Sequence, residues 1–181
     1  VDIEGGYSDD PAAVGEVVAR VIDAGAAGIN LEDGAGDPAL LCAKIAAARA
    51  AAARVGVALF INARTDVYLR GMGPAEARVE ATLARAARYQ GAGADGIFVP
   101  GVVTANDIAA LVAGLGLPPN VMARPQLPPA AQLEALGVRR LSAGAAMAEV
   151  VYGKVAALAG AFLRDGVSAA VLEGALDYGA I

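Results

Sequence analysis

The chain has 181 residues, of which 57% are hydrophobic and 4% aromatic, and this length suits one domain with a sizeable core. Its formal net charge of −5 argues against a nucleic-acid partner, and charged residues interrupt the apolar stretches, so no membrane span is expected. It contains no His and one cysteine, Cys42, which excludes His-based nucleophile systems, His-ligated metals and an internal disulfide, and fits a reducing cytoplasm.

Along the chain, short apolar runs alternate with Ala-rich stretches. Strands are expected at the apolar runs 1–3, 28–31, 57–63, 95–99, 119–123 and 138–142. Helices are expected at 10–24, 38–54, 74–91, 104–115, 129–136, 145–164 and 167–177. Runs that are apolar on both faces are typical of parallel strands covered by helices. The repeated β-α units predict an α/β domain over 1–181, either an open wound sheet or a (β/α)8 barrel.

Polar residues gather where the first three predicted strands end. These ends read Asp2-Ile-Glu4, Glu32-Asp33 and Asn62-Ala-Arg64. In parallel α/β folds the active site forms at this edge of the sheet. Several carboxylates at one edge repel each other unless a cation lies between them, and oxygen ligands without His or Cys suit Mg²⁺ or Mn²⁺. An Arg facing such a metal can hold a carboxylate or a phosphoryl group.

A simpler interpretation competes with this one for single residues. An acid at a strand end often caps a helix or faces solvent, and for Asp2 or Glu32 alone both interpretations stay open. The three acidic strand ends together with Arg64 favour a site. Asp66 is expected to orient Arg64 or to cap the next loop.

The segments VDIEGGY, GINLEDG, LFINARTDVYL, GADGIFVPG, NVMARP and LGVRRLSAG occur in one order along the chain. Together they resemble the isocitrate lyase/phosphoenolpyruvate mutase superfamily, and most closely its phosphonomutase-like branch. The resemblance implies a (β/α)8 barrel whose last helix is exchanged with a neighbouring subunit, in a homo-oligomer of two or four chains. It also implies a Mg²⁺ site, or a Mn²⁺ site, near the acidic strand ends.

The resemblance assigns a role to each of the polar residues at the predicted strand ends. Asp2 matches the acid closest to the metal, and Glu4 and Glu32 match carboxylates that hold it largely through water. Arg64 matches the residue that anchors the substrate, and with Glu32 it is the predicted catalytic group. The further predicted substrate-binding residues are Asn62, Asp33 and Ser142. In this family the metal and the Arg stabilise an enolate-like species while a C–C or P–C bond breaks.

The chain departs from the family pattern at two places. VDIEGGY matches the third barrel strand, so the sequence is expected to be an incomplete barrel holding strands 3 to 8, without the first two βα units. The loop at Gly34–Asp37 lacks the Lys, Cys and His that isocitrate lyases carry there. The loop therefore lacks the residues with which isocitrate lyases cleave isocitrate, and the catalytic acid or base is unassigned.

The sequence thus predicts a Mg²⁺-dependent, lyase-like enzyme that cleaves a C–C or P–C bond of a small 2-oxo or 2-hydroxy carboxylate. One alternative is an oxaloacetate-type decarboxylase or a phosphonate hydrolase, which needs only the metal, Arg64 and water. Another alternative is an inactive fragment or a non-catalytic ligand-binding barrel.

Overall fold

A computed structural model describes residues 1–180. The chain divides into two compact units, Val1–Ser142 and Ala143–Ile181, and each is described by itself. The expectation of a single domain over 1–181 stays a prediction.

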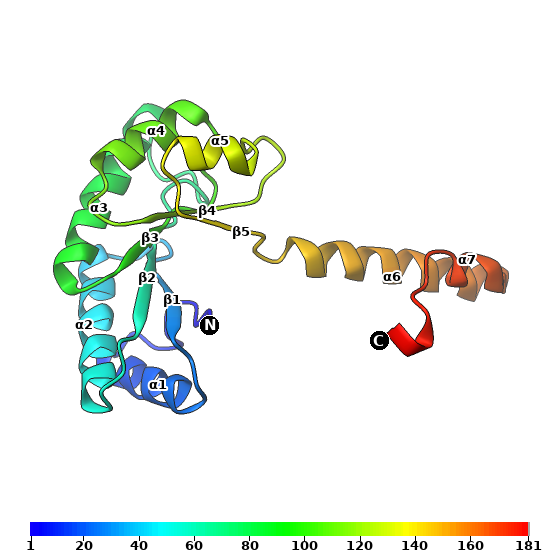
Figure 1. The fold of residues 1–181 in the computed structure, drawn as a ribbon, viewed down its shortest axis with the longest axis horizontal. Coiled ribbons are helices and arrows are strands. Elements are labelled where there is room, and N and C mark those ends of the chain that lie inside the picture. The colour runs from blue at the N-terminus through cyan, green and yellow to red at the C-terminus, as the bar shows by residue number, and fades with distance from the viewer. Residues whose placement is uncertain (181) are drawn as a thin grey trace. The chain divides into compact units, whose positions relative to one another are not determined.

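The first unit is built on a parallel sheet whose strands lie side by side in chain order. The strands are β1 (Gly28–Glu32), β2 (Phe60–Arg64), β3 (Gly96–Phe98), β4 (Pro119–Met122) and β5 (Arg140–Ser142). The helices are α1 (Pro11–Asp23), α2 (Pro38–Arg54), α3 (Arg78–Ala92), α4 (Ala105–Gly114) and α5 (Ala130–Ala135), with a short 3-10 helix, η1 (Ala75–Ala77), before α3. Figure 1 shows the helices along the outer side of the curved sheet and the strands on its inner side.

The alternation of side chains along the strands separates an apolar face from a polar one. Ile29, Leu31 and Ile61 are almost fully buried in the core that the helices cover. The residues between them point to the opposite face, where Asn30 pairs in register with Asn62 and Glu32 pairs with Arg64. Three of the polar residues singled out in the sequence, Glu32, Asn62 and Arg64, therefore share the inner face of the sheet.

Five of the six predicted strands form, and the first does not. Residues 1–3 make only an isolated parallel bridge between Asp2 and Asn30, supported by a hydrogen bond of 3.2 Å from Ile3 N to Asn30 O. Further backbone hydrogen bonds join this segment to β1, from Asn30 N to Val1 O at 2.8 Å and from Glu32 N to Glu4 O at 2.9 Å. The φ of 50° at Glu4 and of 83° at Gly6 then turn the chain away from β1. The α/β class and the parallel sheet are confirmed, and the arrangement agrees with part of a TIM-barrel-like fold.

The helices follow the capping signals. Asp10 and Asp37 accept hydrogen bonds from Ala12 N and Ala39 N, and a proline begins each of α1 and α2. The predicted helix at 74–91 is divided into η1 and α3.

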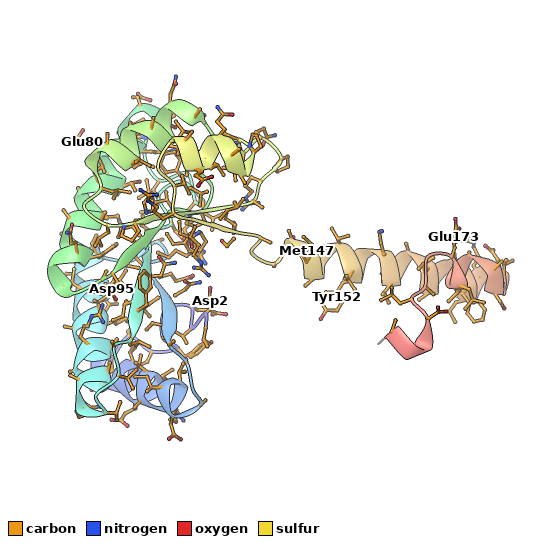
Figure 2. All side chains as sticks on the ribbon, viewed as in Figure 1. Asp2, Glu80, Asp95, Met147, Tyr152 and Glu173 are labelled. Atoms are coloured by element: carbon orange, nitrogen blue, oxygen red, sulfur yellow. The ribbon has the colours of Figure 1, made fainter. Side chains whose placement is uncertain are left out.

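In the second unit, α6 (Ala146–Asp165) is followed by α7 (Ser168–Leu172) and by a 3-10 turn, η2 (Tyr178–Ala180). The prediction of one helix over 167–177 is wrong, because Glu173 is extended and Gly174 has a φ of 72°. Large apolar side chains along α6 are exposed, and Met147 and Tyr152 project from it in Figure 2.

The length and composition of α6 also correct an expectation. It is a 20-residue helix with a mean hydropathy of 1.5 and no buried residue, so it is long and apolar enough to cross a membrane. The expectation that charged residues interrupt every apolar stretch too often for a membrane span is wrong for α6. Glu149 and Lys154 interrupt this helix too rarely to exclude a span by length and composition. A single such helix is weak evidence, since helices that pack in soluble assemblies pass the same test.

Candidate functional site

The carboxyl ends of β1 and β2 bring a carboxylate and a guanidinium group together. Glu32 and Arg64 are register partners, and Arg64 Nη1 lies 2.6 Å from Glu32 Oε2. Both side chains are less than one-fifth exposed. The Arg64 guanidinium also lies over the Phe98 ring, 5.8 Å from its centroid. The guanidinium group therefore sits at the strand ends in a fixed position on the inner face.

Asp66 orients Arg64, as the sequence predicted. Arg64 donates from Nε to Asp66 Oδ1 at 2.7 Å and from Nη2 to Oδ2 at 3.2 Å. Arg70 adds a bond of 3.0 Å to the same carboxylate, which is completely buried. Burial on its own would lower the pKa of Arg64, but the hydrogen bond and charge of Asp66, followed by the charge of Glu32, hold that pKa above its usual value.

The Asp33 carboxylate contacts α3 and the backbone of Asp66 rather than the Arg64 guanidinium. Its Oδ2 accepts hydrogen bonds from Arg85 Nη1 at 2.8 Å and from the Tyr89 hydroxyl at 2.5 Å, and its Oδ1 accepts from Asp66 N at 3.0 Å. Burial, then the bond to Asp33, raises the pKa of Tyr89, so this phenol stays protonated and donates. The geometry makes Asp33 a support for the Asp66 loop, and its substrate-binding role stays a prediction.

Asp2 and Glu4 lie in a strained loop before α1. Asp2 Oδ1 accepts from Glu4 N at 2.9 Å, and Asp2 Oδ2 accepts from Asn30 Nδ2 at 3.2 Å. Figure 2 shows Asp2 beside β1 on the inner side of the first unit. Within residues 1–180, Glu4 and Tyr7 are the non-glycine residues with positive φ, at 50° and 59°. Such strain persists where the surrounding structure holds it, and it is common at functional sites.

The chemistry of these donors fits a hydrated Mg²⁺ better than a preformed metal cage. No three His, Cys, Asp or Glu side chains converge as metal ligands within the described residues. The acids nevertheless affect one another: burial raises the pKa of Glu32, Arg64 lowers it, and Asp66, Asp2 and Glu4 raise it further. Mg²⁺ keeps several waters and needs only one or two protein carboxylates. The assignment of Asp2, Glu4 and Glu32 as metal-site residues stays a prediction.

A network of amide side chains crosses the inner face below Arg64. Asn62 Nδ2 donates to Asn30 Oδ1 at 2.9 Å and to Asn120 Oδ1 at 3.1 Å. Arg140 Nη1 donates to the same two oxygens, at 3.3 Å and 2.9 Å. Asn120 Nδ2 reaches Ser142 Oγ at 3.4 Å, which joins this predicted rim residue to the network. The structure thus brings Asn62 and Ser142 into one network.

Sequence reasoning missed Asn30, Asn120 and Arg140 in this network. The signal was present, since Asn30 lies two residues before Glu32 and so shares its face of the strand. It also missed Arg85 and Tyr89, which hold Asp33 from α3. No sequence pattern joins those two residues to β1, because the contact depends on how α3 packs against the sheet.

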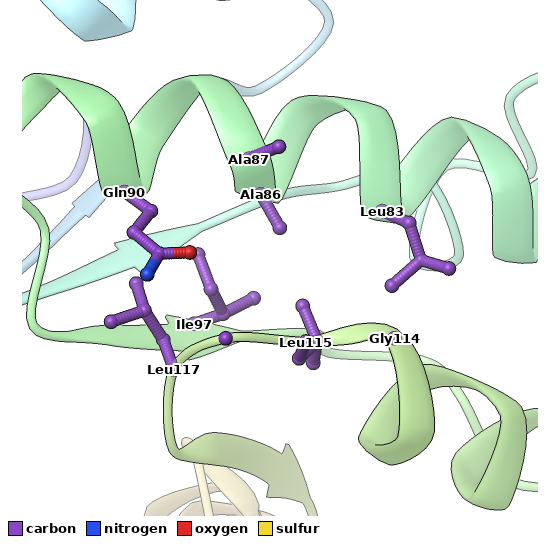
Figure 3. A pocket seen from close by; sticks show the side chains of 9 residues that line it. Leu83, Ala86, Ala87, Gln90, Ile97, Gly114, Leu115 and Leu117 are labelled. Carbon is purple, nitrogen blue, oxygen red and sulfur yellow. The ribbon is translucent and has the colours of Figure 1, made fainter.

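A cavity of about 250 Å³ lies between the loop that follows Glu4 and the loop that follows β1. Glu32, Asp33 and Lys44 are among its lining residues. Lys44 is nearly buried and its Nζ donates to Gly5 O at 2.8 Å, which clamps the strained loop to α2. A second cavity, between α3 and the chain that follows α4, holds about 40 Å³ and is mostly apolar, with Gln90 on its wall (Figure 3). Only the first has room for a small metabolite.

The parallel β-α units, with Glu32 and Arg64 at the strand ends, form an α/β fold that agrees with part of a TIM-barrel-like fold. The chain belongs to the phosphoenolpyruvate phosphomutase family, whose model matches residues 1–163. The resemblance to the phosphoenolpyruvate mutase/isocitrate lyase superfamily is therefore confirmed.

The chain also has curated relatives. A protein of Mycobacterium tuberculosis strain H37Rv, described as uncharacterized, is 42% identical over 148 residues, which cover 80% of this chain and 53% of the relative. The chain thus spans about half the length of the curated relatives it matches.

Two solved structures from Burkholderia cenocepacia J2315 have the same fold. One, assigned as a phosphonomutase, is 46% identical to this chain, with a TM-score of 0.81. The match covers 88% of this chain and 67% of the phosphonomutase chain. The other, assigned as a lyase/mutase, is 32% identical with a TM-score of 0.86, and covers 99% and 66%.

Proposed function

We propose that this chain carries the carboxylate-anchoring part of a Mg²⁺-dependent, lyase-like enzyme. The substrate is a small 2-oxo or 2-hydroxy carboxylate, and the enzyme breaks a C–C or P–C bond in it through an enolate-like species. The observation that carries the proposal is the Arg64 guanidinium, held at the strand ends by the buried Asp66 and paired with Glu32. Family membership and the relatives assigned as mutase and lyase support the same reaction class.

Arg64 is arranged to bind a substrate carboxylate. Its contacts to Asp66 use Nε and one N–H of Nη2, and its contact to Glu32 uses one N–H of Nη1. A guanidinium has five N–H donors, so one on each terminal nitrogen is left for a carboxylate or phosphonate. Because Asp66 fixes the plane of the group, the substrate is oriented as well as bound.

Glu32 is the proposed proton acceptor. Its raised pKa makes it a stronger base than an ordinary glutamate, and Arg64 keeps the carboxylate form available near neutral pH. We propose that Glu32 takes a proton from a substrate hydroxyl or from water as the bond breaks. A bound Mg²⁺ or Mn²⁺, held by Asp2 and through water by Glu4 and Glu32, would stabilise negative charge on the substrate oxygen.

The test uses the full polypeptide, with oxaloacetate, 2-methylisocitrate and phosphonopyruvate as substrates. Replacing Arg64 by Gln should abolish Mg²⁺-dependent turnover of whichever substrate is used. The matched control is Arg70→Gln, which removes another arginine bound to Asp66 but leaves Arg64 in place. Equal turnover in the Arg64 variant and the wild type would refute the proposal.

The metal assignment has its own test. Calorimetric Mg²⁺ titration of Asp2→Asn should show a loss of affinity, whereas Asp23→Asn, which removes an exposed acid at the end of α1, should not. If Asp2→Asn binds Mg²⁺ as tightly as the wild type, Asp2 is not a metal ligand.

The short loop after β1 favours a second candidate function. Gly34–Asp37 leads directly into α2 and offers no lysine, cysteine or histidine as an acid. A decarboxylase of oxaloacetate-type substrates or a phosphonate hydrolase needs no such group. Release of CO₂ from oxaloacetate, or of phosphate from phosphonopyruvate, would identify these reactions. If no substrate is turned over, a non-catalytic ligand-binding barrel or an inactive fragment is favoured.

We also propose a cytoplasmic homo-oligomer of two or four chains that exchange C-terminal helices. The exposed apolar side chains of α6 support this, since an apolar surface of that kind is usually covered in an assembly. Replacing Val151 by Glu on α6 should lower the mass of the full polypeptide measured by light scattering. Replacing Lys154 by Glu, which alters charge at an already polar position, should leave it unchanged.

A further inference from the structure

We infer that Arg140 positions the Asp2 carboxylate for a divalent cation by acting through Asn30. This rests on the proposed role of Asp2 as a metal ligand. Arg140 is on β5, at the opposite edge of the sheet from the Asp2 bridge, and neither Arg140 nor Asn30 is among the predicted site residues. Both would be positioning residues, since they do not touch the cation or the substrate.

The contacts of Asn30 allow one orientation of its amide. Its Oδ1 accepts from Asn62 Nδ2 at 2.9 Å and from Arg140 Nη1 at 3.3 Å. Its Nδ2 donates to Asp2 Oδ2 at 3.2 Å. A flipped amide would place its NH₂ against two donors and its oxygen against a carboxylate, which is unfavourable at both ends. Arg140 therefore helps to keep the donor end of Asn30 toward Asp2.

Arg140 is itself held in place. Its Nη1 donates to Asn120 Oδ1 at 2.9 Å, and Asn120 is almost completely buried. Asn120 Nδ2 donates to Val121 O at 2.6 Å, which fixes the direction of the Asn120 oxygen. Within residues 1–180, Arg140 has no carboxylate within 4.0 Å. Its charge therefore acts on the amide oxygens, and hydrogen bonds from a charged donor are stronger than neutral ones.

The consequence falls on Asp2. Its two oxygens each accept one protein hydrogen bond, from Glu4 N and from Asn30 Nδ2. An ionised carboxylate has about four acceptor positions, so each oxygen keeps one for a cation or its water. Groups that hydrogen-bond to a metal ligand and orient it typically change metal affinity about 10- to 100-fold when they are removed.

The test measures Mg²⁺ binding to the full polypeptide by calorimetry, without substrate. Arg140→Met keeps the aliphatic stem and should weaken binding about 10-fold, and Arg140→Lys should restore part of the loss. The matched control is Arg139→Met, which removes the same charge from the preceding, exposed residue. Unchanged affinity in Arg140→Met while Asp2→Asn binds weakly would overturn this inference and leave the proposed metal site intact.

A double variant separates positioning from a general effect of charge. If Arg140 acts through Asn30, Arg140→Met combined with Asn30→Leu should bind Mg²⁺ as Asn30→Leu does alone. Fully multiplicative losses of Mg²⁺ affinity would overturn the inference.

Nuclear magnetic resonance of the Asn30 side-chain amide gives a readout without metal. Arg140→Met should increase the mobility of this amide, and Arg139→Met should not. An equally rigid Asn30 amide in Arg140→Met also refutes the inference. Unchanged affinity in Asp2→Asn refutes the metal site and the role of Arg140 toward the cation together.

Discussion

Asp66 is the residue whose replacement should most clearly disturb the site without touching its open side. Its carboxylate is fully buried and accepts from Arg64 at 2.7 Å and 3.2 Å and from Arg70 at 3.0 Å. Asp66→Asn keeps the shape but removes the charge and turns an NH₂ group toward the arginines. Breaking a buried ion pair costs about 3–5 kcal/mol, and we expect about 3 kcal/mol because Arg64 keeps Glu32 as a partner.

Urea unfolding of the full polypeptide, followed by circular dichroism because the chain has no Trp, measures this change. Arg70→Ala is the matched control: it removes a half-exposed partner of the same carboxylate and should cost no more than about 1 kcal/mol. The apparent KM should rise in Asp66→Asn, since Arg64 loses its orientation. A loss of stability in Asp66→Asn no larger than that in Arg70→Ala would refute this reasoning.

Three further outcomes are expected. Tyr89→Phe removes a donor to Asp33 and should lower the free energy of unfolding by about 1 kcal/mol. Gly101→Ala should lower the free energy of unfolding by more than about 2 kcal/mol, because its Cβ would lie 2.8 Å from the backbone of the Tyr68–Leu69 turn at a φ of 91°. Gly73→Ala, at a φ of 69° in open space, should lower it by about 1 kcal/mol. Thermal melting compares the two variants. Burial raises the pKa of Glu32 above 4.5, so the folded state holds this proton more tightly than the unfolded state. The free energy of unfolding should therefore fall as the pH rises through the raised pKa. Urea titrations across pH should show a smaller fall in Glu32→Gln.

The fold was largely predictable because its signals are local. Short apolar runs predicted five of the strands, and the Asp-Pro pairs at 10–11 and 37–38 predicted the beginnings of two helices. The first strand was mispredicted because the left-handed backbone at Glu4 limits the segment to an isolated bridge, which apolar character does not reveal. The last helix was overextended because a single glycine, Gly174, outweighed the helical composition around it.

The site was predictable only in part. Position at a strand end was enough to predict that Glu32 and Arg64 lie together and that Asp66 orients Arg64. It could not show that Asp33 turns toward α3, since that depends on where Arg85 and Tyr89 arrive after helix packing. The amide network has the same origin, because its members come from β1, β2, β4 and β5, which only the folded sheet brings together.

The left-handed backbone at Glu4 has a consequence for protein engineering. A non-glycine residue in that conformation costs about 1–2 kcal/mol, and glycine would adopt it freely. A selection for thermal tolerance alone should therefore favour Gly at position 4 and discard a carboxylate of the proposed metal site. Consensus or library designs that aim to raise the thermal stability of this protein should keep Glu4 unchanged. They should substitute exposed positions away from the first loop instead.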